Sequence, residues 1–144
     1  MKNRFMINGD VTTIFVKYLD RTITTIIDTK DLPIAQSFNG TWTACFGSKR
    51  SKLYIQGMVY MKRNGNKPAH KKQFFLARLL MGFPEGLVVD HINDDSLDNR
   101  RSVNLQAITN GENVRKQIKM RGKGVYRTVK RMARERGIGH YYDA

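Results

Sequence analysis

The chain has 144 residues, and 26 lysines and arginines against 12 aspartates and glutamates give it a formal net charge of +14 and a pI of about 10.2. Hydrophobic residues make up 40% of it, which excludes wholesale disorder. No apolar run approaches the roughly 18 residues of a membrane span, and the N-terminus lacks the apolar stretch of a signal peptide. A polyanion is therefore the expected partner, and neither a membrane nor an export route is expected.

The distribution of charge indicates the kind of polyanion, and the cysteine content indicates the cellular compartment. Residues 100–144 carry a net charge of +9 and residues 1–99 only +5, an asymmetry typical of nucleic-acid binding. The single cysteine, Cys45, excludes an internal disulfide and favours a reducing compartment, so we expect a cytoplasmic protein. One cysteine and three histidines make a structural zinc site an unexpected feature.

The first part of the chain predicts a small antiparallel sheet. Alternating and β-branched residues favour strands, Asp20-Arg21 favours a tight turn, and Asn64-Gly65 is a strong hairpin signal. Gly57 falls inside an expected strand and indicates a bulge. The expected strands are residues 12–19, 22–27, 41–46, 53–61 and 71–75.

The second part predicts the order strand, long loop, strand, helix. A short helix over residues 76–82 ends at Gly82 and Pro84, and strands over 86–92 and 104–109 flank a polar loop. Thr109 and Asn110 are both suitable N-caps for a helix running toward Arg121. The sequence therefore predicts an α+β fold with a β-rich region at 1–70, a core at 71–121 and a basic tail at 122–144.

Three side chains in the second part suggest chemistry. Asp90 and His91 end a predicted strand, and Asn113 lies in the first turn of the following helix. A carboxylate and an amide oxygen are hard ligands that suit Mg²⁺ or Mn²⁺, and a neutral imidazole can take a proton from water near pH 7. By strand alternation His91 is expected to point away from Asp90, unless the end of the strand twists. Each feature also has an ordinary structural explanation, because Asp-His pairs are common and an Asn in a first turn usually caps a helix.

The stretch from Gly86 to Asn113 resembles the HNH endonucleases of phages and mobile introns. It contains Asp-His, Leu-Asp-Asn-Arg, Asn-Leu and Thr-x-x-Glu-Asn in the family's order, and it is closest to the branch that ends in Asn. The resemblance is close over residues 70–121 and looser over the β-rich part. It implies a ββα-metal nuclease that hydrolyses phosphodiester bonds in double-stranded DNA, by nicking or double-strand cleavage, in the cytoplasm of the host cell if the gene belongs to a phage.

The resemblance also assigns roles. His91 becomes the general base, Asp90 and Asn113 the ligands of one Mg²⁺ or Mn²⁺ ion, and Asn104 the residue that orders the loop between the strands, with Asn99 as the competing candidate for that duty. Arg100 and Arg101 are expected beside the scissile phosphate, where guanidinium groups suit phosphate geometry, or else in a solvated loop. The further DNA contacts expected on the helix and the tail are Arg115, Lys116, Lys119, Arg121, Lys123 and Arg127.

Some positions depart from the family pattern. Ala77 stands where the family usually has His, Asp94 where Gly is common, and Val103 looks like an extra residue in the loop. Residues 122–127 resemble the first strand of an AP2-type DNA-binding module, and a disordered basic tail is the other interpretation. A catalytically inactive DNA-binding protein on the same scaffold is the alternative function, but the retention of Asp90, His91 and Asn113 together favours an enzyme. We expect a monomer or a weak dimer.

Overall fold

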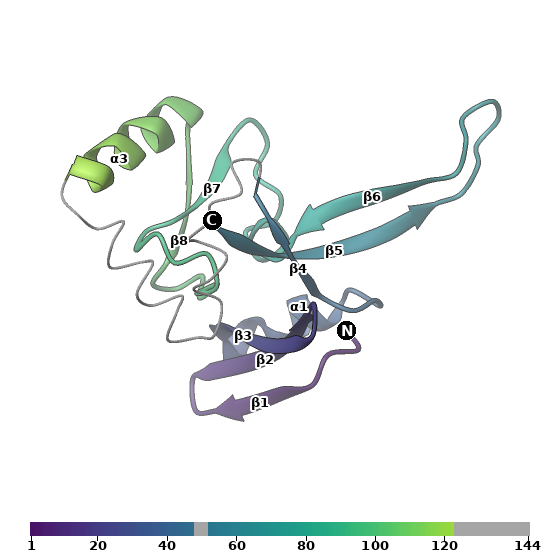
Figure 1. Cartoon of the computed structure of the whole chain (residues 1–144), viewed down its shortest axis with the longest axis horizontal. Helices are drawn as coiled ribbons and strands as arrows, with labels where there is room; N and C mark the ends of the chain where they lie inside the picture. Colours follow the sequence, from purple (N-terminus) through teal and green to yellow (C-terminus); the bar gives the residue numbers. More distant parts are fainter. Residues whose placement is uncertain (48–51, 123–144) are drawn as a thin grey trace.

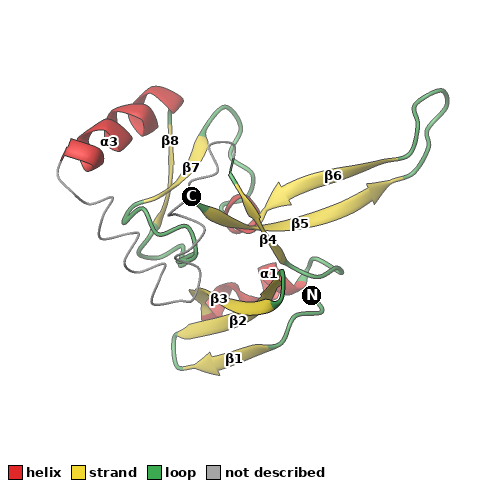
Figure 2. Ribbon diagram, in the orientation of Figure 1, coloured by secondary structure: helices red, strands yellow, loops and turns green. Residues whose placement is uncertain are grey.

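The computed structural model describes residues 1–47 and 52–122 and shows an α+β fold, as predicted (Figure 1). Two three-stranded antiparallel sheets are followed by a two-stranded hairpin and a helix (Figure 2). Strand β2 of the first sheet packs beside β4 of the second. The single small sheet expected for the first part is thus wrong, since that part divides into two sheets.

The elements lie close to their expected places. In chain order these elements are β1 (Phe5–Asn8), β2 (Val11–Tyr18), β3 (Arg21–Asp28), the 3-10 turn η1 (Thr29–Asp31), α1 (Leu32–Gln36), β4 (Thr43–Phe46), β5 (Leu53–Met61), β6 (His70–Phe75), α2 (Leu76–Leu80), β7 (Val88–His91), β8 (Leu105–Ile108) and α3 (Asn110–Gly122). No described helix has the length and apolar character needed to cross a membrane.

The first sheet follows from alternation, because Ile14, Val16, Ile23 and Ile27 are all buried on one face. Its central hairpin closes one residue earlier than expected. Tyr18 pairs with Arg21, so the turn is made by residues 19 and 20. Strand β1 was not predicted from the sequence; its residues are exposed, so they carry no buried-exposed alternation.

The second sheet corrects the interpretation of Gly57 as a bulge. Gly57 pairs with Phe74 in an unbroken register between β5 and β6. A Cβ at this position lies 2.6 Å from Phe74 Cζ and 3.0 Å from Trp42 Cζ3. The glycine therefore serves packing, because it lets two aromatic rings approach the backbone of a central strand.

One hydrophobic core joins both three-stranded sheets, the short helices α1 and α2, and the β7–β8 hairpin. Trp42 lies at its centre with no exposed surface, and its indole N–H donates to the carbonyl oxygen of Ala35 at 3.2 Å. Leu97 and Leu105, from the second part of the chain, belong to the same buried cluster as Ile14 and Leu53. The β-rich region and the nuclease-like region thus share their apolar interior.

The contact at Gly57 generates a prediction. We expect Gly57→Ala to lower the free energy of unfolding by about 1–3 kcal/mol, because the added methyl group must displace the ring of Phe74 or Trp42 in a packed core. Gly111→Ala is the matched control, since a Cβ there lies at an ordinary 3.5 Å from its nearest neighbour, Arg115. Urea unfolding of both variants measures the effect, and equal stabilities contradict it.

Candidate active site

Helix α3 begins with a reciprocal pair of side-chain contacts. The Thr109 backbone N–H donates to Glu112 Oε2 at 2.9 Å, and the Glu112 backbone N–H donates to Thr109 Oγ1 at 3.2 Å. This is a capping box, so Thr109 is the N-cap of the two candidates. It fixes the first turn of α3, which carries Asn113.

The hairpin of β7 and β8 brings the other two residues to the same place. Asp90 pairs with Gln106 and His91 with Leu105, and α3 packs against β7. Asp90, His91 and Asn113 line one cavity of about 470 Å³. The three side chains singled out from the sequence are therefore brought together.

Asp90 and His91 both line this cavity, but their side chains have different partners. The Asp90 carboxylate bonds Gln106 and Lys116, whereas His91 Nε2 bonds Asn99. His91 is the last residue of β7, and the chain leaves it in a turn closed by the Asp94 backbone N–H, which donates to the His91 carbonyl oxygen at 2.9 Å. The extended part of the strand therefore ends at the histidine.

The Asp90 carboxylate faces a cation. Its Oδ2 accepts hydrogen bonds from Gln106 Nε2 at 2.8 Å and from Lys116 Nζ at 2.5 Å. Lys116 Nζ also donates to the His91 carbonyl oxygen at 2.6 Å. A carboxylate and a carbonyl oxygen thus converge on one positive charge. Lys116 lies one helical turn after Asn113, so both residues face β7.

The imidazole of His91 is held by hydrogen bonds whose directions can be assigned. The Leu97 carbonyl can only accept, so the Thr25 hydroxyl donates to it at 2.7 Å and accepts from Asn99 Nδ2 at 2.9 Å. Asn99 Oδ1 then faces His91 Nε2 at 2.9 Å, and this nitrogen must be the donor. In the neutral ring the lone pair is consequently on Nδ1.

Burial lowers the pKa of His91 below its usual value, and this outweighs the opposing effects of the Asn99 hydrogen bond and the nearby carboxylates of Asp90 and Asp95. The imidazole is therefore neutral near pH 7, which is the form that can accept a proton. The ring of Tyr54 lies 6.1 Å from the His91 ring, between centroids.

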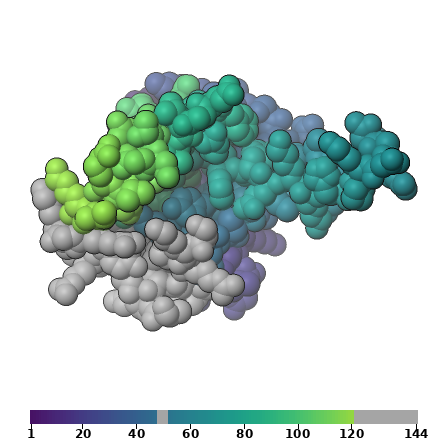
Figure 3. All heavy atoms as spheres, turned by 90° about the horizontal axis from the view of Figure 1, so that it is seen from above, coloured from purple at the N-terminus to yellow at the C-terminus, as the bar shows by residue number. Residues whose placement is uncertain are grey.

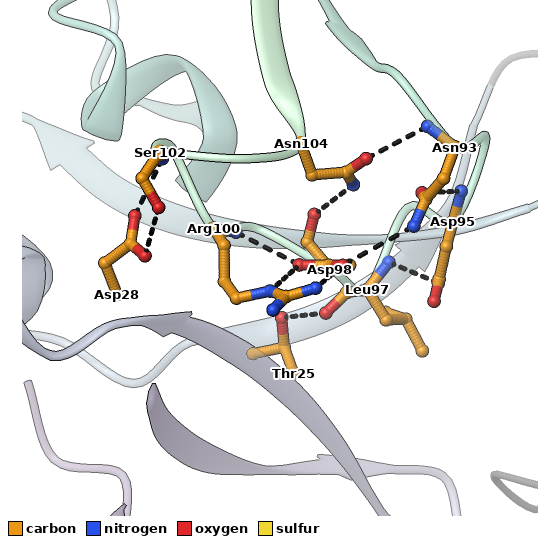
Figure 4. Close-up of polar contacts among 9 residues, drawn as sticks. All are labelled: Thr25, Asp28, Asn93, Asp95, Leu97, Asp98, Arg100, Ser102 and Asn104. Atoms are coloured by element: carbon orange, nitrogen blue, oxygen red, sulfur yellow. Dashed lines mark hydrogen bonds and ion pairs between the residues drawn. The ribbon is translucent and has the colours of Figure 1, made fainter. Parts of the chain in front are cut away.

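Asn104 and Asn99 occupy different places in the loop of residues 93–104. Asn104 Oδ1 accepts from the Asn93 backbone N–H at 2.9 Å, and its Nδ2 donates to the Asp98 carbonyl oxygen at 2.7 Å, which ties the two ends of the loop together (Figure 4). Asn99 instead contacts His91 and Thr25. Of these two asparagines, Asn104 is the one whose side chain bonds the backbone of the loop.

Part of the chain that contains this site matches a known protein family. Residues 76–115, which run from α2 into α3, match the family model described as HNH endonuclease. Over this segment, called the HNH domain below, the chain is similar to HNH endonucleases. It contains Asp90, His91, Asn104 and Asn113. No curated protein and no solved structure matches the chain. Nothing in the comparisons supports the AP2-type resemblance of the tail, which lies outside the described residues.

The two arginines of the HNH loop have acidic partners. Arg100 donates from Nε and Nη2 to the two carboxylate oxygens of Asp98 at 2.9 and 2.7 Å, and these bonds raise the pKa of its guanidinium group. Arg101 donates from Nε and Nη2 to Asp31 at 3.1 and 2.5 Å, which links the HNH loop to the N-terminal region. Their contacts to the scissile phosphate stay a prediction.

The other predicted DNA contacts are placed unevenly. Arg115 and Lys119 are exposed on α3, whereas Lys116 is engaged at Asp90. The side chain of Arg121 is not described, and Lys123 and Arg127 lie outside the described residues.

The structure shows the contacts or the burial of each position that departs from the family pattern. Asp94 forms an ion pair with Lys52 and accepts from Gln117 Nε2 at 3.1 Å, so its charge is balanced. Ala77 is buried and lines the cavity, and Val103 is exposed. Lys52, which also lines the cavity, was missed from the sequence because a lysine in a strand gives no sign of which acid it will meet.

The hydrogen bonds of Thr25 generate a prediction. Thr25→Val keeps the shape of the side chain but removes the hydroxyl that bonds Leu97 and Asn99, so we expect a loss of about 1–3 kcal/mol of stability. Thr22→Val, on the exposed part of the same strand, is the control. Nitrogen-15 NMR of the His91 ring should show the Nε2–H tautomer in the original protein and a mixture in Thr25→Val. A pure Nδ1–H tautomer in the original protein contradicts the assignment.

Proposed function

We propose that the protein is a metal-dependent DNA endonuclease that hydrolyses phosphodiester bonds in double-stranded DNA, of the phage or mobile-element homing type. The observation that carries the proposal is the convergence of Asp90, His91 and Asn113 on one cavity inside the HNH domain. The net charge of +14 supports a polyanionic substrate. The homing type rests on the resemblance of the motif at residues 86–113 to phage and intron nucleases.

The donors at the cavity fit a hard divalent cation. The described residues hold no cluster of three His, Cys, Asp or Glu side chains that would make a soft or all-protein metal site. Asp90 and Asn113 offer a carboxylate and an amide oxygen, and the Lys116 ammonium already shows that oxygens here converge on a positive charge. Mg²⁺ is commonly held by one or two carboxylates together with waters and substrate phosphate. Asp90 and Asn113 would hold one Mg²⁺ or Mn²⁺ ion, which would supply stabilisation of the negative charge that develops during phosphodiester hydrolysis.

The chain's own residues would handle the proton. His91 accepts a proton from the attacking water at Nδ1, while the hydrogen bond from Nε2 to Asn99 Oδ1 fixes the ring orientation. The imidazolium formed in this step is favoured by the nearby carboxylates of Asp90 and Asp95. The loop ordered by Asn104 keeps Asn99 in place for this hydrogen bond.

The competing function is a catalytically inactive DNA-binding protein on the HNH scaffold. Supercoiled plasmid incubated with the protein and Mg²⁺ or Mn²⁺, with EDTA as control, separates the two. Nicked or linear DNA that forms only with metal supports the endonuclease. Plasmid that is bound and shifted but uncut with both metals supports the inactive protein.

For the general base, we expect His91→Ala to reduce the rate of plasmid cleavage by about 10²–10⁴-fold, because a positioned base contributes about that much. DNA affinity, measured by fluorescence anisotropy in EDTA, should change little, since the imidazole is buried. Undiminished cleavage by His91→Ala excludes this residue as the base.

For the metal, Asp90→Asn and Lys116→Met should act in opposite directions. Loss of the carboxylate should abolish Mn²⁺ binding, whereas loss of the ammonium at Asp90 should strengthen it by about tenfold, or about 1.4 kcal/mol. Lys119→Met removes the same charge from an exposed position of α3 and is the control. Calorimetric titration of Mn²⁺ measures all three, and unchanged affinity in Asp90→Asn refutes the ligand assignment.

A further inference from the structure

The hairpin of β5 and β6 projects from the body of the molecule and carries only positive charge. Figure 1 shows it extending well beyond the sheets, and the space-filling view shows it standing clear of the body (Figure 3). No acidic residue occurs between Gln56 and Pro84. We call residues 58–73 the basic arm. Its exposed cations are Lys62, Arg63, Lys67, Lys71 and Lys72.

One face of the basic arm is continuous with the candidate active site. Residues that pair across two strands lie on the same face, and alternate residues of one strand share a face. Tyr60 pairs with Lys71 and Gln56 with Phe75, so these four residues lie on one side of the hairpin. Tyr54 belongs to the same side of β5.

The inner end of this face reaches the catalytic residues. Tyr54 and Phe75 line the cavity together with His91, and their rings lie 5.7 Å apart between centroids. The outer end carries Tyr60, whose side chain is exposed, with Lys71 Nζ 5.3 Å from the centroid of its ring. Six residues of strand separate Tyr54 from Tyr60, which corresponds to about 20 Å.

We propose that the basic arm is a DNA-binding element, in which duplex DNA seated at the cavity continues along the Tyr60–Lys71 face. This inference rests on the proposed function for the identity of the substrate. A reach of about 20 Å equals about six base pairs, and the major groove of B-DNA admits a two-stranded β-ribbon. The exposed tyrosine adds an amphipathic contact surface, and the lysines supply cations to the flanking phosphates.

Charge complementarity favours DNA over a second copy of the chain. Exposed Met58, Tyr60 and Met61 offer some apolar surface for self-association. Pairing two arms, however, brings two identical sets of five cations together without any acidic residue on either arm. Like charges across an interface oppose association, whereas a polyanion neutralises both strands of the hairpin at once.

The test compares two triple variants that lose the same charge. The arm variant is Lys67→Gln, Lys71→Gln and Lys72→Gln, and the body variant is Lys2→Gln, Lys17→Gln and Lys30→Gln, all at exposed positions. Binding of the full chain to a labelled 30-base-pair duplex is followed by anisotropy in EDTA over a series of salt concentrations. We expect the arm variant to bind at least about tenfold more weakly and its log–log salt slope to fall by up to about 2.7, at about 0.9 per lost phosphate contact. The body variant should change each value by much less.

The outcomes separate this inference from the proposed function. Equal losses in the two variants overturn the arm as a specific element, even if the original protein cuts plasmid. If the arm variant alone loses binding and the original protein cuts no plasmid, the arm is supported as a DNA-binding element and the proposed endonuclease function is contradicted. A dimer in sedimentation velocity that Tyr60→Ala dissociates assigns the arm to a second copy and overturns the proposal.

Discussion

The pairing of the HNH loop with the edge of β3 is the constraint on which the site depends. The Ile26 backbone N–H donates to the Leu97 carbonyl oxygen at 3.1 Å, and the Asn99 backbone N–H donates to the Ile26 carbonyl oxygen at 2.8 Å. Asp28 adds two bonds to Ser102, at 2.8 and 2.6 Å, and Arg101 adds the ion pair with Asp31. The loop buries several polar side chains, whose removal from water is tolerated only because they are hydrogen-bonded. The first sheet supplies many of those partners.

The HNH domain is therefore not a self-sufficient unit in this chain. The family match begins at residue 76, but the hydroxyl that orients Asn99, and through it His91, comes from Thr25. Lys52, just before strand β5, pairs with Asp94, and the ring of Tyr54 in β5 lies near that of His91. Both sheets thus contribute to the geometry of the cavity, and the shared hydrophobic core fixes them relative to the β7–β8 hairpin.

What the sequence predicted well has local causes. The span of β5, the β2–β3 hairpin and the start of α3 follow from alternation, turn residues and a capping box, all of which act within a few residues. The convergence of Asp90, His91 and Asn113 followed from their places at element ends. What it missed depends on long-range pairing, as when Arg101 meets Asp31 across 70 residues, or Gly57 accommodates rings from two other segments. Charge and glycine patterns in one sequence do not name such partners.

The distribution of charged partners is also consistent with the proposed separation of DNA binding at the basic arm from catalysis at the cavity. Beside the cavity, Lys116 is paired with Asp90 and Lys52 with Asp94. Arg78, which also lines the cavity, donates to the backbone carbonyl oxygens of Leu87 and Pro84. The ion pairs hold the site in shape, and each one reduces the positive potential that the cavity presents to a phosphate. Cations farther out, in a stretch of the sequence that contains no acidic residue, then add to the attraction of a polyanion. The stretch from Gln56 to Pro84 meets that condition, and the strand alternation that exposes Tyr60 beside Lys71 also aligns them with the face that ends at His91.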